Sequence, residues 1–133
     1  MRVPFAMPLA IGLLAMAPLL SSCFVGIVVN DDGANVTIYE SSGKRQCEPA
    51  LITPQQSARR LSDSGIDVRA SSCAVLTSIA YPAVCGAPSG ELVMHDIDEH
   101  DLGDAERLGF TRVTTLRLTS GEPGYMPIAC TPP

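Results

Sequence analysis

Apolar and polar residues alternate along several short stretches of the chain, and alternation with a period of two predicts β-strands. The clearest examples are Val36 to Tyr39 and Phe110 to Leu118; Glu91 to His95, extended by Ile97, is also predicted to be a strand. An apolar run before the turn-like sequence at 30–33 is expected to pair with the strand at Val36 as a hairpin. The pattern predicts strands at Phe24–Val29, Val36–Tyr39, Ile66–Val68, Glu91–Ile97 and Phe110–Leu118.

A helix is predicted to begin near Thr53. The Thr53 hydroxyl can accept a hydrogen bond from the amide of Gln56, and the Gln56 side chain can reach back to the amide of Thr53. Pro54 suits the first turn of a helix, because its missing N–H has no partner to lose there. Leu61 falls on the inner side of this segment, and Gly65 is expected to end it.

A second helix is predicted after the fourth strand, with Asp98 or Asp101 as its N-cap and Gly109 as its stop. The order strand, helix, strand thus occurs twice. This predicts an α+β fold in which two βαβ units form a small antiparallel sheet with two helices on one face, as in ferredoxin-like proteins. Residues 71–90 and the tail from Ser120 are rich in glycine and proline and are expected to be irregular.

The first 23 residues have the layout of a secretory signal: Arg2, an apolar stretch from Leu9 to Ala17, then small residues. The sequence Leu20-Ser21-Ser22-Cys23 resembles the lipobox of bacterial lipoproteins, in which an aliphatic residue lies three places before the cysteine. The resemblance implies a signal peptide of residues 1–22, a diacylglycerol on the Cys23 sulfur, and one mature domain of residues 23–133.

Several acyl chains at Cys23 would hold the protein on a membrane of the cell envelope, because each buried methylene contributes about 0.8 kcal/mol. Phe24 follows, rather than the Asp that favours the inner membrane, so the outer membrane is the expected location. Two alternatives remain. The run Val3–Val29 is long enough for an uncleaved membrane span, although three prolines interrupt it. An ordinary signal cleaved near Ser22 would leave Cys23 free or paired.

Net charge limits the classes of partner. The chain has 133 residues, enough for one domain with a modest core once the signal is removed. The mature part loses Arg2 and keeps all fourteen acidic residues, so its eight basic residues leave a net charge of −6. This balance excludes nucleic acid as an expected partner, since nucleic-acid binding needs a basic face.

Four cysteines remain after Cys23, an even number that suits an oxidising compartment and structural disulfides. No C-x-x-C motif is present, which argues against thioredoxin-type redox chemistry. Cys73 and Cys85 flank the expected irregular crossover, and Cys47 and Cys130 lie in two other irregular stretches. We therefore expect the pairs Cys73–Cys85 and Cys47–Cys130.

The densest group of polar residues runs from His95 to Asp104. Imidazole and carboxylate groups bind divalent metals, but the spacing matches no ligand motif, and His95 and His100 fall on different predicted elements. Acidic residues also gather at helix N-termini because they complement the helix dipole. The favoured interpretation is a solvated helix start, with no metal or other cofactor.

No G-x-S-x-G motif is present, and no catalytic constellation emerges. The sequence therefore favours a non-enzymatic role: a membrane-anchored lipoprotein of the cell envelope that acts as a binding or accessory module, with an envelope protein as a candidate partner. A structural or assembly role without a soluble ligand is the first alternative. A metal-dependent enzyme is the second.

Overall fold

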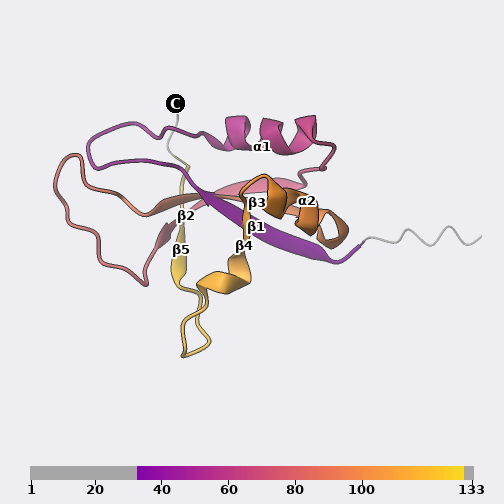
Figure 1. The fold of residues 1–133 in the computed structure, drawn as a ribbon. Coiled ribbons are helices and arrows are strands. Elements are labelled where there is room, and N and C mark those ends of the chain that lie inside the picture. The colour runs from indigo at the N-terminus through magenta and orange to yellow at the C-terminus, as the bar shows by residue number, and fades with distance from the viewer. Residues whose placement is uncertain (1–32, 131–133) are drawn as a thin grey trace, which may run out of the picture. The chain divides into compact units, whose positions relative to one another are not determined.

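The structure of the protein is a computed structural model that describes residues 33–130 (Figure 1). Cys23, the lipobox and the expected hairpin strand Phe24–Val29 lie outside these residues. Residues 31–133 form a compact unit by their contacts. Every core residue, strand pairing and disulfide described below lies within that unit, so it holds the whole framework of the fold.

Five antiparallel strands form one sheet. Their bounds are β1 (Asn35–Ser41), β2 (Ala70–Leu76), β3 (Glu91–Asp98), β4 (Thr111–Arg112) and β5 (Tyr125–Ile128). The order across the sheet is β4-β1-β3-β2-β5. The two central strands have the longest pairing, from Asn35 opposite Asp98 to Ser41 opposite Leu92.

Two helices connect the strands. Helix α1 (Pro54–Asp63) follows β1, and helix α2 (Leu102–Arg107) follows β3 after a 3-10 turn at Glu99–Asp101. Strand β3 lies between β1 and β2, and β1 lies between β3 and β4, so the two βαβ units interleave. This connectivity confirms the predicted ferredoxin-like α+β fold, to which β5 adds a strand beside β2.

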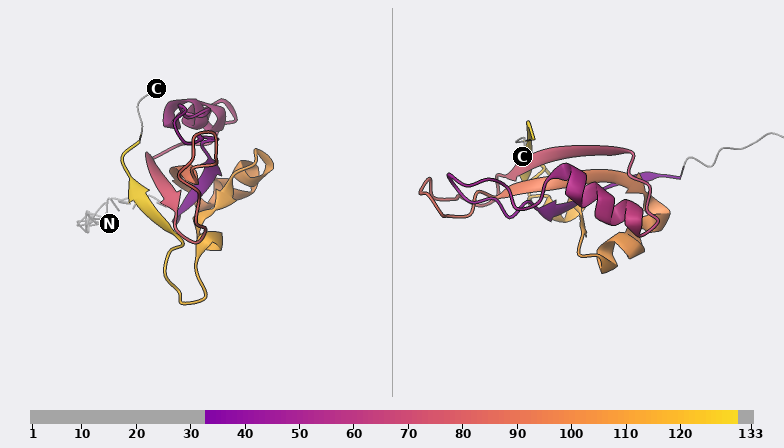
Figure 2. Two further views of the ribbon diagram at one scale, coloured as in Figure 1. Left: turned by 90° about the vertical axis from the view of Figure 1, so that its left-hand side faces the viewer. Right: turned by 90° about the horizontal axis from the view of Figure 1, so that it is seen from above.

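Both helices lie on one side of the sheet (Figure 2). Leu61 of α1 and Ala105 of α2 share a core with Ile38 and Ile97 of the central strands, and all four are fully buried. Since alternate residues of a strand face opposite sides, the neighbours of Ile38 and Ile97 in the sequence face away from the helices.

The opposite face of the sheet carries a second, smaller core. Ala74, Leu92 and Met94 are buried there, with Tyr39 and Leu76 partly buried beside them. The 3-10 turn Val113–Leu116 (orange-yellow in Figure 1) contributes Val113 and Leu116 to this cluster. The 3-10 turn covers only part of this face, and the remaining part is available for a pocket.

The start of α1 agrees with the sequence. Thr53 Oγ1 accepts from the Gln56 amide at 3.2 Å, and Gln56 Oε1 accepts from the Thr53 amide at 2.9 Å. At α2 the predicted N-cap position is confirmed, since Asp101 is the N-cap of α2 and Asp98 is that of the preceding 3-10 turn, but neither side chain makes a capping hydrogen bond. Asp98 instead accepts from Arg69 at 2.6 Å, a charged partner that outcompetes a backbone amide.

Three expectations about strands are wrong. The second strand is β2 at Ala70–Leu76 rather than 66–68, because Ile66 is buried in the helix-facing core in the connection before β2. The strand expected at 110–118 stops after Arg112, where the chain turns to cover the other face. The tail from Ser120, expected to be irregular, contains β5, which pairs with β2.

The expected disulfide pairing is also wrong, although all four cysteines are bonded. The bonds are Cys47–Cys85 and Cys73–Cys130, each with Cα atoms 5.1 Å apart. Cys73 lies within β2 opposite Ile128 of β5, so strand pairing brings Cys130 to it. The loops that carry Cys47 and Cys85 leave the same end of the sheet, which places those two cysteines together (Figure 1).

Candidate functional site

Two loops extend side by side from one end of the sheet. One joins β1 to α1 and the other joins β2 to β3 (left side of Figure 1). Besides the Cys47–Cys85 bond, backbone hydrogen bonds join them: Gln46 N to Ala87 O at 2.8 Å and Gly86 N to Gln46 O at 2.9 Å. Ser89 Oγ also donates to Lys44 O at 2.9 Å. The loops are thus fixed to one another.

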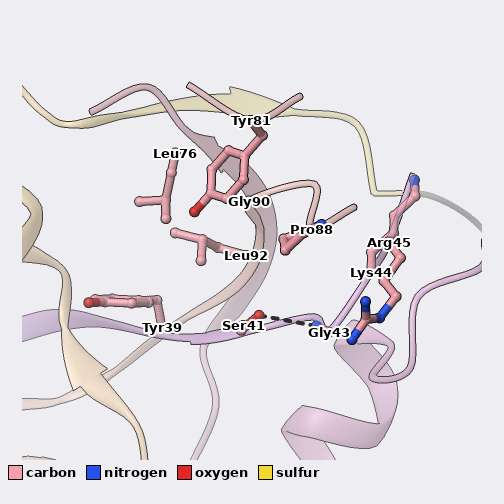
Figure 3. A pocket seen from close by; sticks show the side chains of 10 residues that line it. All are labelled: Tyr39, Ser41, Gly43, Lys44, Arg45, Leu76, Tyr81, Pro88, Gly90 and Leu92. Atoms are coloured by element: carbon pink, nitrogen blue, oxygen red, sulfur yellow. Dashed lines mark hydrogen bonds between the residues drawn. The ribbon is translucent and has the colours of Figure 1, made fainter. Parts of the chain in front are cut away.

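A pocket of about 400 Å³ lies between these loops and the sheet face that the helices leave uncovered (Figure 3). This volume is in the range of small-molecule sites. One wall of the pocket is formed by side chains from the sheet: Tyr39 of β1, Leu76 of β2 and Leu92 of β3. Tyr81 and Pro88 come from the β2–β3 loop, so the pocket depends on how that loop is held.

The place of the Tyr81 ring is set by Gly90. Gly90 has a φ of +73°, a conformation that favours glycine, and a Cβ at that position would collide with the ring of Tyr81. The ring therefore rests directly on the backbone at Gly90. This contact keeps Tyr81 in the pocket wall, close to Leu76 and Leu92 (Figure 3).

The pocket also has two cationic side chains, Lys44 and Arg45. Lys44 Nζ is 3.0 Å from Oε2 of the buried Glu91 and is therefore paired. Arg45 is exposed and donates from Nη1 to the carbonyl of Gly86 at 2.8 Å. Within residues 33–130, no carboxylate forms an ion pair with Arg45. The guanidinium keeps further donors for an external anion.

A second polar group lies on the helix side of the sheet, around His95. His95 Nε2 is 2.8 Å from Ser57 Oγ, and His95 Nδ1 is 2.8 Å from Ser71 Oγ. Ser57 Oγ donates to Glu40 Oε1, and Arg60 Nη1 pairs with Glu40 Oε2 at 2.7 Å. This chain of contacts connects β1, α1, β2 and β3.

The hydrogen bonds assign the tautomer of His95. Ser57 has one hydroxyl proton, which it gives to Glu40, so it must accept from Nε2–H of His95. Nδ1 then accepts the hydroxyl proton of Ser71. The neutral imidazole is fully satisfied, and burial lowers the pKa of His95 below its ordinary value of 6.5, against the smaller raising effects of Glu40 and Asp96.

This assignment predicts pH-dependent stability. Below about pH 6.5 unfolded chains take up a proton on histidine that the folded protein takes up only at lower pH, so stability falls as pH drops through that value. The thermal midpoint should therefore decrease between about pH 7.5 and pH 5.5. His95→Gln should lower the midpoint overall but flatten this decrease, as differential scanning calorimetry can show.

His100→Gln is the matched control, because His100 is exposed whereas His95 is buried. It should keep the parental pH dependence. An unchanged slope in His95→Gln would show that other groups cause the effect.

The structure disperses the residues of the His95–Asp104 segment. His95 is buried beneath α1, whereas His100 is exposed beside Asp101, 3.0 Å away. Glu99 pairs with Arg112 at 2.7 Å. In the described part of the chain, no three His, Cys, Asp or Glu side chains are grouped to hold a metal ion.

Sequence reasoning missed the pocket altogether. Its residues come from β1, β2, β3 and two loops, so no local spacing connects them. One signal was present in the composition. The chain has three tyrosines and no tryptophan, and two of those tyrosines, Tyr39 and Tyr81, line the pocket.

Comparisons with protein-family models, with curated proteins and with solved structures find no match for this chain. Among the helices of residues 33–130, none has the length and apolar character needed to cross a membrane. The alternative of a membrane span at Val3–Val29 concerns residues outside that range.

Proposed function

We propose that the protein is a lipoprotein of the bacterial cell envelope, anchored through lipid on Cys23 and favouring the outer membrane, that acts as a binding module. The pocket between the two joined loops carries the binding part of this proposal. The signal layout and lipobox of residues 1–23 support the anchor. Two disulfides in so small a domain are consistent with an exported protein.

The chemistry of the pocket favours binding over catalysis. Its lining contains no histidine or carboxylate that could serve as a general base. Ser41 and Lys44 of the lining have the S-x-x-K spacing of a serine nucleophile and a lysine base, but Lys44 Nζ is paired with Glu91 Oε2 at 3.0 Å. Ser41 Oγ accepts a hydrogen bond from the Gly43 amide at 3.1 Å. The Ser71–His95 pair lies on the other side of the sheet, where Ser57 rather than a carboxylate holds the second ring nitrogen.

The position of the pocket suits an anchored protein. Strand β1 enters the domain at Asn35 and ends at Ser41, where the first pocket loop begins (Figure 1). Seven strand residues at about 3.3 Å each place the loops about 20 Å from the point where the chain enters. The pocket loops therefore lie at the end of the domain remote from Asn35.

One observation favours a second role, contact with an envelope protein. The same two loops expose large apolar side chains: Leu51 is 74 % exposed, Val84 63 % and Ile79 55 %. Exposed apolar residues gathered on one feature are common at protein interfaces. An accessory or assembly role without a soluble ligand would use these exposed apolar side chains rather than the pocket.

The binding role predicts that residues 31–133 bind N-phenyl-1-naphthylamine, a neutral fluorescent aromatic probe, saturably. Tyr81→Ala should weaken this binding about tenfold, because it removes a ring that would cover one side of the probe. Fluorescence titration provides the dissociation constants.

Ile79→Ala changes the same loop at an exposed position outside the pocket lining and should bind like the parent. If the parent shows no saturable binding, or if Tyr81→Ala and Ile79→Ala bind the probe equally well, the pocket is not a binding site. The assembly role is then favoured.

A further inference from the structure

The pocket has two chemically different ends (Figure 3). At one end lie the rings and branched side chains of Tyr39, Leu76, Tyr81 and Leu92. At the other end lie Lys44 and Arg45, both from the loop that follows β1. A ligand that fills the whole pocket therefore meets apolar surface along its body and positive charge at one tip.

Arg45 is the cation best placed to bind a ligand. Its guanidinium makes one described hydrogen bond, to the carbonyl of Gly86, and that bond fixes the side chain without neutralising it. An arginine held in this way offers a planar set of donors that match the two oxygens of a carboxylate or sulfonate. Lys44 is paired with Glu91, so it adds a weaker and partly compensated charge.

The charge of the pocket is opposite to that of the protein. The chain has a net charge of −5, yet both charged residues in the pocket lining are cations, and the lining contains no acidic residue. In an acidic protein, a local positive site of this kind attracts anions while the remaining surface repels them. The apolar end then selects, among anions, those that carry a hydrophobic body.

The apolar end suits a flat body better than a bulky one. Tyr39 and Tyr81 come from different elements, a central strand and a loop, and the Tyr81 ring is fixed on the Gly90 backbone. Fixed aromatic rings bind flat apolar groups through stacked or edge-to-face contacts at little entropic cost.

We propose that the pocket binds a small organic anion with a flat apolar body, with its carboxylate or sulfonate on Arg45 and its body against Tyr39, Tyr81, Leu76 and Leu92. This inference rests on the binding role proposed above and adds the chemical class of the ligand. It distinguishes the pocket from the exposed side chains of Leu51, Ile79 and Val84, which offer apolar surface alone.

The test compares two probes that share an aromatic body. Anilinonaphthalene sulfonate carries a negative charge, whereas N-phenyl-1-naphthylamine is neutral. Residues 31–133 should bind the anionic probe more tightly, and Arg45→Gln should weaken that binding about tenfold or more, since a hydrogen bond between charged groups is lost. The same variant should leave the neutral probe's dissociation constant unchanged.

Arg117→Gln is a close control. Arg117 is also exposed and donates from Nη1 to a glycine carbonyl, that of Gly121 at 3.4 Å, but it does not line the pocket. This variant should bind both probes like the parent. Thermal midpoints of both variants should match that of the parent, which excludes probe binding to unfolded protein.

The outcomes distinguish a failure of this inference from a failure of the binding role on which it rests. If neither probe binds, the binding role itself fails. If both probes bind and Arg45→Gln affects neither, the pocket is a binding site but does not select anions, and the inference is overturned. Sedimentation with phosphatidylglycerol vesicles that is lost in Arg45→Gln would assign Arg45 to a lipid surface and would also overturn it.

Discussion

Replacing Cys47 and Cys85 together with alanine is expected to lower the free energy of unfolding by about 4 kcal/mol and to abolish probe binding in the pocket. The bond closes a loop of 38 residues, and the chain-entropy treatment assigns about 4 kcal/mol to a loop of that length. It also ties together the two loops that supply Arg45 on one side of the pocket and Tyr81 on the other. Urea unfolding and titration with N-phenyl-1-naphthylamine measure the two effects.

The second disulfide is the matched comparison. Cys73–Cys130 closes a loop of 57 residues, so its removal should cost a similar amount of stability, about 4 kcal/mol. It holds the end of β5 beside β2 rather than the pocket loops. Under conditions in which circular dichroism shows that this variant is folded, its dissociation constant for the probe should stay within about threefold of the parental value, which is a small difference in binding free energy. Equal loss of binding in both double variants would show that the pocket responds to stability alone.

Leu61→Ala is expected to lower the free energy of unfolding by about 2–5 kcal/mol. Leu61 is the fully buried leucine through which α1 contributes to the helix-facing core. Its removal leaves a space that the surrounding sheet residues cannot close. Chemical unfolding monitored by circular dichroism measures the change.

Leu51→Ala is the corresponding control, since Leu51 is 74 % exposed in the first pocket loop. Truncation at such an exposed position should change stability by no more than about 0.5 kcal/mol. A cost below about 1 kcal/mol for Leu61→Ala would be too small for a close-packed core and would contradict the placement of α1.

The elements that could be predicted are those whose signals are local. Strand β1 alternates because one of its faces packs against the helices. Strand β3 is instead a short, mostly apolar run, because Leu92 and Met94 face one core and Ile97 faces the other. The start of α1 is encoded in Thr53 and Gln56, which bond each other's amides whatever the rest of the chain does. These elements were enough to predict the interleaved βαβ arrangement.

The elements that could not be predicted depend on pairing between distant segments. Strand β2 begins with exposed polar residues, Ser71 and Ser72, and only its pairing with β3 makes it a strand. Strand β5 contains Pro127 and lies at the edge of the sheet, where the missing N–H of proline is tolerated. Because both strands were missed, the disulfide pairing was predicted wrongly.

The candidate site could not be predicted from the sequence for a similar reason. Tyr39 and Tyr81 are 42 positions apart in the sequence, and the Cys47–Cys85 bond and the β1–β3 register bring their segments together. By contrast, the predicted lipid anchor depends on a contiguous motif ending at Cys23, which the sequence displays directly.

The most direct test of the proposed function is the mass of the N-terminal peptide of the protein purified from bacterial membranes. Our account predicts a peptide that begins at Cys23 and carries a diacylglycerol on its sulfur, with or without a further acyl group on the new amine. A peptide that retains residues 1–22, or one that begins elsewhere without lipid, would contradict the proposed anchor.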